Sequence, residues 1–286
     1  MSPRSAVGKM IRMNCRVTLE VAGAVAHVQL RRADKLNALD GRMFAELVET
    51  GEHLLSRADV RAIVLSGQGS SFCAGLDASF FDLILRGERL GQDGPTLNRP
   101  LATRTHGIAN RAQRAATVWA DAPVPVIAAL QGFCFGGGLQ IALGADLRFA
   151  APDARLSAME IRWGLVPDMG GFVHARRLLR ADVWAELVYT GRQIGGEEAV
   201  RLGLVTRLCR DPLEEALALA GEIAGRSPDA VRAAKRLLTQ AHHSHDAAVL
   251  LKESTEQEQL IAGANQLEAI RAHLEKRAPR FSDIAN

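Results

Sequence analysis

Hydrophobic and polar positions along the chain follow two different periods. Short apolar runs of strand length, several of them rich in β-branched residues, occur at residues 17–21, 26–31, 61–66, 124–130 and 146–150. Elsewhere apolar residues recur every three to four positions, which predicts amphipathic helices at residues 40–58, 80–90, 103–120, 172–180 and 182–190. Asp40 is expected to cap the first of these helices. Residues 154–161 read as an extended segment. Strands that alternate with helices predict an α/β core.

After residue 210 the pattern is helical almost throughout. Helices are expected at residues 213–224, 229–242, 246–262 and 266–276. Their apolar stripes need a partner, which a second subunit would supply. We therefore expect three segments: a flexible leader over residues 1–13, an α/β core with the ligand site over 14–210, and a helical oligomerisation region over 211–286.

Residues 124–146 combine a strand, a glycine-dense turn and the start of a helix. The turn holds Gly132, Gly136, Gly137 and Gly138. In a helix each glycine costs roughly 1 kcal/mol relative to alanine. The cluster therefore indicates either bare backbone beside a ligand or tight strand–helix packing. Backbone N–H groups of such a turn, at a helix start, favour an anion.

A second corner of the same kind follows the strand at residues 61–66. It reads Cys73-Ala74-Gly75-Leu76-Asp77 and also offers small residues and free amides. Open α/β sheets place ligands at such carboxyl ends of strands. Two amides that converge on one oxygen make an oxyanion hole, which suits a thioester carbonyl that gains charge on enolisation.

Composition narrows the class of protein. The 286 residues carry a net charge of +3 with lysine and arginine scattered among the acids, which argues against a nucleic-acid surface. No apolar run approaches the length of a membrane span. Cys15, Cys73, Cys134 and Cys209 are widely spaced, which is typical of reduced thiols in a cytoplasmic protein. A histidine cluster near residue 242 lacks a nearby acid, so no metal site is predicted.

Six segments carry a resemblance to a known family. They read ADKLNALD (34–40 with its preceding alanine), SSFCAGLD, QGFCFGGGLQIALGAD, RLSAMEIRWGLVPDMGG, SPDAVRAAK and EKRAPRF. In this order the chain resembles the crotonase superfamily, the enoyl-CoA hydratase/isomerase group. The resemblance implies a crotonase-like spiral of ββα units with a C-terminal helical region, and a homotrimer or dimer of trimers. It also implies an acyl-CoA thioester substrate and no separate cofactor, because CoA is part of that substrate.

The resemblance also assigns residues to the site. It implies that the oxyanion-hole amides are those of Leu76 and Gly137. The residues expected to line the substrate and its CoA, partly through backbone contacts, are Lys35, Leu36, Ala38, Ala74, Gly75, Asp77 and Gly136. For Lys35 an ordinary solvated lysine is an equally open interpretation.

Three polar side chains bear on the reaction. Hydratases of the family use two glutamates to hold and activate water. The first of them falls at Gln140 in this chain, and the second falls at Glu160, where the glutamate is retained. An amide such as that of Gln140 cannot accept a proton, which favours isomerisation of an enoyl- or dienoyl-CoA over hydration. The apolar neighbours of Glu160 are expected to raise its pKa. Asp168 matches an aspartate of the family's dienoyl-CoA isomerases, and a turn role for this Pro-Asp pair is equally open.

Three alternatives stay open. The first is an enoyl-CoA hydratase of fatty-acid β-oxidation, and the second is a non-catalytic acyl-CoA binder. The third is a hydrolase, because residues 132–136 fit the G-x-C-x-G pattern of a nucleophile elbow with Cys134 as the nucleophile. Its triad would need a downstream aspartate and a histidine such as His174.

Overall fold

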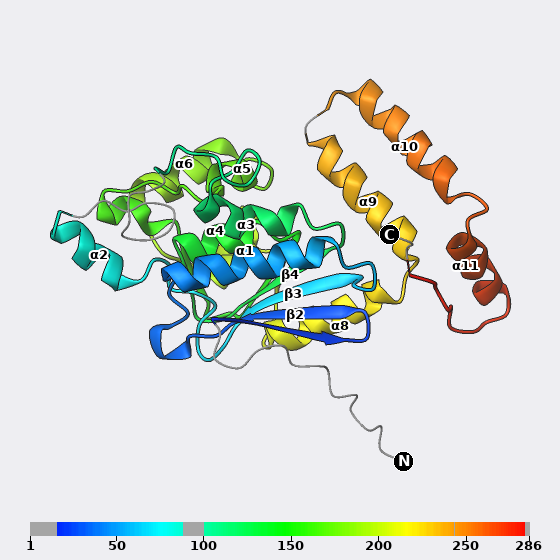
Figure 1. Ribbon diagram of the computed structural model, residues 1–286, viewed down its shortest axis with the longest axis horizontal. Helices are drawn as coiled ribbons and strands as arrows, with labels where there is room; N and C mark the ends of the chain where they lie inside the picture. Colours follow the sequence, from blue (N-terminus) through cyan, green and yellow to red (C-terminus); the bar gives the residue numbers. More distant parts are fainter. Residues whose placement is uncertain (1–15, 88–99, 243, 284–286) are drawn as a thin grey trace, which may run out of the picture.

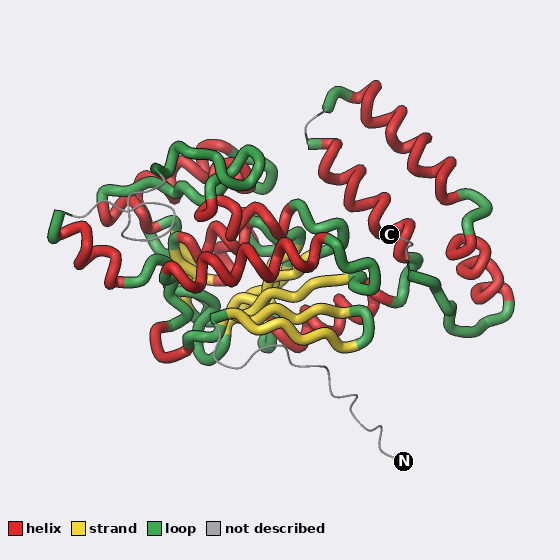
Figure 2. Tube along the Cα trace, viewed as in Figure 1, coloured by secondary structure: helices red, strands yellow, loops and turns green. Residues whose placement is uncertain are grey.

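The computed structural model describes residues 16–87, 100–242 and 244–283. The expected leader, Cys15 and the end of the helix expected over residues 80–90 lie outside these ranges. The described chain forms a sheet with α1, α3 and α4 over one face and α8 under the other, and three further helices extend to one side (Figures 1 and 2). The α/β class expected from the alternating pattern is confirmed.

Among the described residues, two sheets are present. The six-stranded sheet has the order β1-β2-β3-β4-β6-β9 and comprises Val17–Ala22, Val25–Leu30, Ala62–Gly67, Val126–Leu130, Leu147–Ala150 and Arg207–Leu208. The smaller sheet has the order β5-β7-β8 and comprises Phe133–Phe135, Arg155–Ser157 and Ile194–Gly195. Within the larger sheet β1 pairs with β2 antiparallel and the other pairs are parallel. Every residue of β3 and β4 is buried, as their continuous apolar runs predict.

The helices lie close to their expected places. They are α1 Gly41–Leu55, α2 Ala78–Leu85, α3 Arg111–Ala120, α4 Gly137–Leu143, α5 Gly171–Ala175, α6 Ala181–Thr190, α7 Gly196–Leu202, α8 Pro212–Ala224, α9 Pro228–Ala241, α10 Asp246–Leu260 and α11 Ala264–Leu274. Short 3₁₀ helices are η1 Ala33–Lys35 and η2 Met159–Trp163. The side chain of Asp40 accepts a hydrogen bond from the backbone N–H of Met43, which confirms the predicted cap.

Three local predictions are wrong at their boundaries. The helix expected from residue 103 begins only at Arg111, because Asn110 and Gln113 form a reciprocal capping box there. The segment expected to be extended up to Ile161 turns into η2 after three strand residues. The helix expected over residues 172–180 is the shorter α5. The glycine turn also contains a strand, β5, that its composition conceals.

The C-terminal helices divide differently from the expectation. Helix α8 packs against β3 and β4 and belongs to the core, because its buried alanines Ala216 and Ala220 join the apolar cluster under the sheet. The helices that extend from the core therefore begin at α9, rather than at residue 211 (Figure 1). On these helices several large apolar side chains are exposed, namely Leu238, Leu250, Leu251, Ile261 and Leu274.

A partly buried ion pair attaches α9 to the core. Lys235 Nζ donates to Asp146 Oδ1 at 2.7 Å, and Asp146 also accepts the Val126 N–H at 2.7 Å. The lysine side chain is 6% exposed and the aspartate 32%. We expect Lys235→Ala to lower the free energy of unfolding by about 2 kcal/mol, since it strands a partly buried carboxylate. Urea titration measures this effect.

The control for this prediction is an exposed pair in the same region. Arg226 and Glu222 lie four residues apart with both side chains more than 60% exposed. Arg226→Ala should therefore cost less than about 0.5 kcal/mol. An unchanged urea midpoint for Lys235→Ala, equal to that of the control, would show that this ion pair does not hold α9.

Candidate active site

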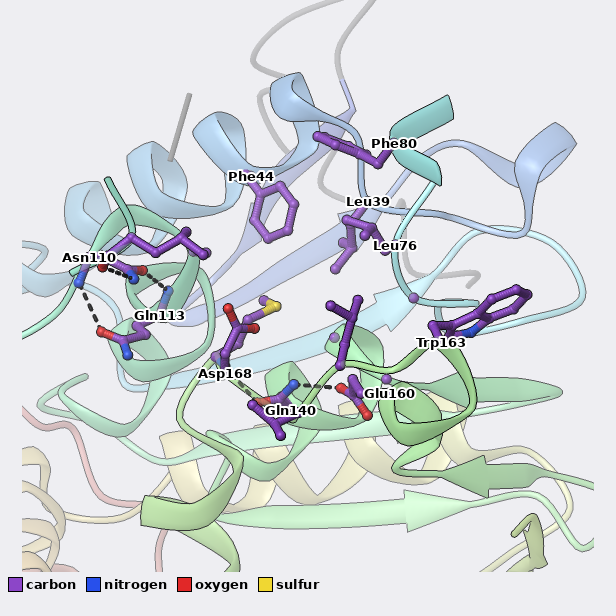
Figure 3. Close-up of a pocket in the computed structure, with 18 of the residues that line it drawn as sticks. Leu39, Phe44, Leu76, Phe80, Asn110, Gln113, Gln140, Glu160, Trp163 and Asp168 are labelled. Carbon is purple, nitrogen blue, oxygen red and sulfur yellow. Dashed lines mark hydrogen bonds between the residues drawn. The ribbon is translucent and has the colours of Figure 1, made fainter. Parts of the chain in front are cut away.

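A cavity of about 900 Å³ lies where the segments that follow β3 and β4 meet. Its wall is mainly apolar, with large side chains from Leu39, Phe44, Leu76, Phe80 and Trp163 around the space (Figure 3). Two clusters of polar side chains also line the cavity. The first comprises Gln140, Glu160 and Asp168, and the second comprises Arg104, Asn110 and Gln113. This lining suits a ligand that has an apolar chain and a polar group at its reacting end.

The two glycine-rich corners come together in the cavity through backbone pairing. Cys73 N–H donates to Phe133 O at 2.9 Å, and Phe135 N–H donates to Cys73 O at 3.0 Å. On the other side, Leu39 N–H donates to Gly75 O at 2.7 Å. These bonds fix the loop on both edges of Leu76. The loop at residues 73–77 and the glycine turn after β4 therefore lie side by side, as the sequence predicts.

Two backbone N–H groups are left free in this arrangement. Leu76 and Gly137 both line the cavity, and neither N–H donates to a protein acceptor within the described residues. Gly137 is the first residue of α4, where helix N–H groups have no intrahelical partner. Both groups are thus available to an oxygen atom of a ligand.

The glycines at the corner serve both of the purposes that the sequence leaves open. A Cβ on Gly138 would lie 2.6 Å from Cys73 O, so this residue permits tight strand–helix packing. A Cβ on Gly137 would lie 2.7 Å from Leu39 Cδ1 and 2.9 Å from Met169 Sδ, on the cavity side. Bare backbone at Gly137 therefore keeps its N–H exposed to the cavity.

Glu160 is held at one oxygen and free at the other. Its Oε1 accepts a hydrogen bond from Gln140 Nε2 at 2.7 Å (Figure 3). Its Oε2 is buried and has no hydrogen-bond partner among the described residues. Burial raises the pKa of the Glu160 carboxyl, and the nearby charge of Asp168 adds to the effect, while the bond from Gln140 opposes it. A carboxylate of this kind is a candidate general base.

Gln140 makes three side-chain hydrogen bonds to the protein. The residue is 2% exposed, and its Oε1 accepts the N–H groups of Met169 at 2.7 Å and Gly171 at 3.0 Å. These two donors fix the amide so that Nε2 faces Glu160. The side chain accordingly contributes an N–H donor and no proton acceptor to Glu160.

Asp168 shares the cavity with Glu160. Its side chain points into the space from the loop after η2 (Figure 3) and keeps contact with solvent through it. Surrounding protein raises the pKa of the Asp168 carboxyl by burial. The placement brings a second carboxyl group into the cavity, on a side of it different from Glu160.

The remaining predicted residues divide into two groups. Ala74, Gly75 and Gly136 line the cavity, whereas Lys35, Leu36, Ala38 and Asp77 do not. Asp77 instead caps α2 by accepting the Ser79 N–H at 2.8 Å, and it pairs with Arg32. The carbonyls of Leu36 and Ala38 accept bonds from Ala74 N–H and Arg32, which shape the loop beside the cavity. Lys35 is exposed on η1.

Sequence reasoning missed most of the cavity wall. Phe81 and Trp163 stack with their ring centroids 4.6 Å apart at its edge. Arg104 donates to Gln113 Oε1 at 2.8 Å and to Leu101 O at 2.8 Å, which organises the loop before α3. Aromatic residues on helices read as core in a sequence, so no local signal separates these wall residues from it.

The hydrolase alternative does not agree with the structure. Cys134 is fully buried on β5 and does not line the cavity. Burial raises the pKa of its thiol well above the ordinary value. His174 is also buried, which lowers its pKa to about 4. A buried thiol with a raised pKa is a poor nucleophile, and it stands in a strand rather than at an elbow.

The described residues contain no group of three or more histidine, cysteine, aspartate or glutamate side chains that could hold a metal ion. Over the same ranges, no helix combines the length and apolar character needed to cross a bilayer.

Comparison with known proteins gives consistent matches. The enoyl-CoA hydratase/isomerase family model matches residues 20–284. The mitochondrial Delta(3,5)-Delta(2,4)-dienoyl-CoA isomerase of Homo sapiens is 36% identical over 225 residues, covering 77% of this chain and 67% of its own. "Probable enoyl-CoA hydratase echA8" of Mycobacterium bovis is 32% identical over 261 residues, covering 90% and 94%.

Solved structures agree with the sequence matches. The enoyl-CoA hydratase from Bacillus anthracis superposes with a TM-score of 0.81 at 28% identity, over 93% of this chain and 98% of that one. The crotonase-like fold expected from the sequence motifs is thereby confirmed, as is the expectation of an enzyme of this group. The chain belongs to the enoyl-CoA hydratase/isomerase family.

Proposed function

We propose that the protein moves a double bond along an enoyl- or dienoyl-CoA by proton transfer. The observation that supports this most is the pairing of Glu160 with Gln140. Glu160 lines the cavity with one buried carboxylate oxygen that has no hydrogen-bond partner in the described structure, and the group beside it is an amide. Such a site can remove and return a proton. It lacks, at Gln140, the second base that would deprotonate water.

The proposed reaction runs through an enolate. The thioester oxygen accepts the N–H groups of Leu76 and Gly137, and Oε2 of Glu160 removes a proton from the α-carbon. Negative charge moves onto the thioester oxygen, where the two donors stabilise it. The same carboxyl returns the proton to the γ-carbon of a 3-enoyl-CoA. On a 3,5-dienoyl-CoA, Asp168 delivers a proton to the ε-carbon. With a 3-enoyl-CoA one carboxyl takes up and returns the proton, so the step balances within the site. With a 3,5-dienoyl-CoA, Asp168 must start protonated, and the cycle closes when Glu160 releases its proton to water and Asp168 takes one up from water.

Hydration of a 2-enoyl-CoA is the second candidate function. It is supported by the name of the Mycobacterium bovis relative. Hydration asks the site to place and deprotonate a water molecule beside Glu160. Gln140 presents an amide N–H to Glu160 and no base that could deprotonate the water, which favours the isomerase.

The proposal extends to the cofactor and the assembly. CoA is bound as part of the substrate along the loop at residues 35–38, and no other cofactor takes part in the proton transfer. We propose a homotrimer or a dimer of trimers, supported by the exposed apolar side chains of α9, α10 and α11.

Asp168 distinguishes the two substrate classes. We expect Asp168→Asn to lower kcat/KM for a 3,5-dienoyl-CoA by about 10²-fold, because an amide cannot deliver the proton to the distant carbon. Turnover of a 3-enoyl-CoA should change only a few-fold, since Glu160 completes that reaction alone. Steady-state assays with the two substrates measure the difference.

The control is Asp153→Asn, at an exposed aspartate in the turn after β6. It should leave both activities unchanged. If Asp168→Asn retains full dienoyl-CoA turnover, Asp168 is a turn residue and the dienoyl-CoA part of the proposal is wrong.

A further inference from the structure

Gln140 connects the two segments that carry the cavity's carboxyl groups. Its Nε2 reaches Glu160 on η2, and its Oε1 accepts the N–H groups of Met169 and Gly171, which flank the turn after Asp168. We propose that Gln140 is a positioning residue that holds Glu160 and the Asp168 turn in one fixed arrangement for proton transfer. This inference rests on the proposed isomerase function and assigns a role to the residue that replaces a hydratase glutamate.

The base of the Gln140 side chain is itself rigid. Its backbone N–H donates to Gly136 O at 3.0 Å within the first turn of α4. Two residues earlier, Gly138 packs against Cys73 so closely that a Cβ would lie 2.6 Å from the carbonyl oxygen. The helix can therefore not slide relative to the loop that carries Leu76. Through its hydrogen bonds, the side chain of Gln140 holds both carboxyl-bearing segments in place relative to α4.

The Asp168 turn depends on the oxygen of Gln140. Met169 and Gly171 are buried, and their N–H groups both donate to this one atom. Without it, two buried donors would lack an acceptor, which is unfavourable because neither would regain a hydrogen bond to water. Packing is also close there, because a Cβ on Gly171 would lie 2.9 Å from Oε1. The turn would move rather than leave both donors unpaired.

Glu160 depends on the nitrogen of Gln140. The N–H bond goes to Oε1, and Oε2 has no hydrogen-bond partner in the described structure. Charged groups lie on η2 itself and on the elements around Glu160, and Arg162 is two residues from it. Asp168 acts on it across the cavity, and the acids of the adjoining α6, Asp182 and Glu186, pair outward with Arg180 and Arg192. A substitution of Gln140 should therefore change the pKa of the Glu160 carboxyl.

Two substitutions separate the two halves of this contact. Gln140→Glu keeps an oxygen for Met169 and Gly171 but replaces the N–H toward Glu160 with a second carboxylate oxygen. Gln140→Met has similar length and removes both. Both variants should raise the pKa of Glu160, so the acid limb of the kcat/KM profile should move up by about one pH unit. For Gln140→Met, kcat/KM should also fall by about 10²-fold.

The ratio of substrates reports on the Asp168 turn. Gln140→Glu should keep the wild-type ratio of dienoyl-CoA to 3-enoyl-CoA turnover, because the turn keeps its acceptor. Gln140→Met should lower that ratio. Should Gln140→Met fail to fold, Gly171→Ala displaces the same oxygen and should lower the ratio likewise. The control is Gln131→Met, at a glutamine that donates to Gly67 O at 2.7 Å outside the cavity, and it should move neither the acid limb nor the ratio.

A readout without substrate keeps this inference separate from the proposed function. The Glu160 carboxyl is followed by ¹³C NMR in protein labelled at glutamate, with Glu160→Gln to assign its signal. A raised titration midpoint in both Gln140 variants supports the positioning role even if neither substrate is turned over. An unchanged midpoint in both variants, or an equal fall of the substrate ratio in both, would overturn it.

Discussion

Replacing Glu160 with glutamine is expected to lower kcat/KM by about 10³-fold, the largest loss in the site. The substitution keeps the size of the side chain and a hydrogen-bonding oxygen. It removes the basic oxygen Oε2, which lies buried without a partner in the described structure. Because the α-proton then has no acceptor, enolate formation should stop. Steady-state kinetics with a 3-enoyl-CoA measure the loss.

Stability should move in the opposite direction. Burial raises the pKa of the Glu160 carboxyl in the folded protein. A raised carboxyl pKa means that the ionised form is disfavoured on folding, so stability falls as the pH rises from the unfolded pKa to the folded one. Neutral pH is above the ordinary range, and Glu160→Gln should therefore be as stable as the wild type or more so. Loss of activity together with a lowered urea midpoint would instead indicate a structural role.

The control for this prediction is Glu253→Gln, at an exposed glutamate on α10. It should leave both activity and stability unchanged. Below the pKa of Glu160 the wild-type rate should decline as the base becomes protonated. If Glu160→Gln kept more than a tenth of the wild-type kcat/KM, Glu160 would not be the base.

The second large effect is expected at Gly137. A Cβ there would lie 2.7 Å from Leu39 Cδ1 and 2.9 Å from Met169 Sδ, both well inside contact distance. Gly137→Ala must therefore displace the ends of the Leu39 and Met169 side chains, and its methyl group would crowd the cavity beside the Gly137 N–H. Loss of one oxyanion donor costs about 10²–10³-fold in kcat. We expect a fall of about 10²-fold, seen mainly in kcat, because the donor binds the enolate more strongly than the thioester.

Gly221 provides the matched control. It lies in α8 with nothing within 4 Å of a Cβ, so Gly221→Ala should stabilise the protein by up to about 1 kcal/mol and leave kcat unchanged. Gly137→Ala with a normal kcat would contradict an oxyanion role for this amide. Circular dichroism and urea titration on both variants show whether folding is preserved.

The fold could be predicted wherever the pattern is local. The fully buried strands β3 and β4 appear as continuous apolar runs, and Asp40 caps α1 as its position indicates. Helix boundaries were harder to predict from the sequence where a local capping interaction competes with the apolar pattern. The capping box of Asn110 and Gln113 starts α3 at Arg111, although the apolar pattern predicts a helix from residue 103. Which face of the sheet α8 covers depends on tertiary packing, which an amphipathic pattern does not specify.

The candidate site shows the same division. Residue type alone showed that Gln140 cannot act as a base. Its actual partners are the backbone N–H groups of Met169 and Gly171, 29 and 31 positions away in the sequence. No periodicity relates positions so far apart, so the joining of Glu160 to the Asp168 turn emerges only in three dimensions. Asp77 shows the converse, because its place in a site motif concealed a helix-capping role.

In the proposed reaction the site transfers protons and does not add water. The most direct measurement is mass spectrometry of the products formed by the purified protein from 2-enoyl-, 3-enoyl- and 3,5-dienoyl-CoA. We expect products of unchanged mass with a shifted double bond from the 3-enoyl and 3,5-dienoyl substrates, and no reaction of 2-enoyl-CoA with water. Formation of a hydroxyacyl-CoA, heavier by one water, as the main product of 2-enoyl-CoA would contradict it.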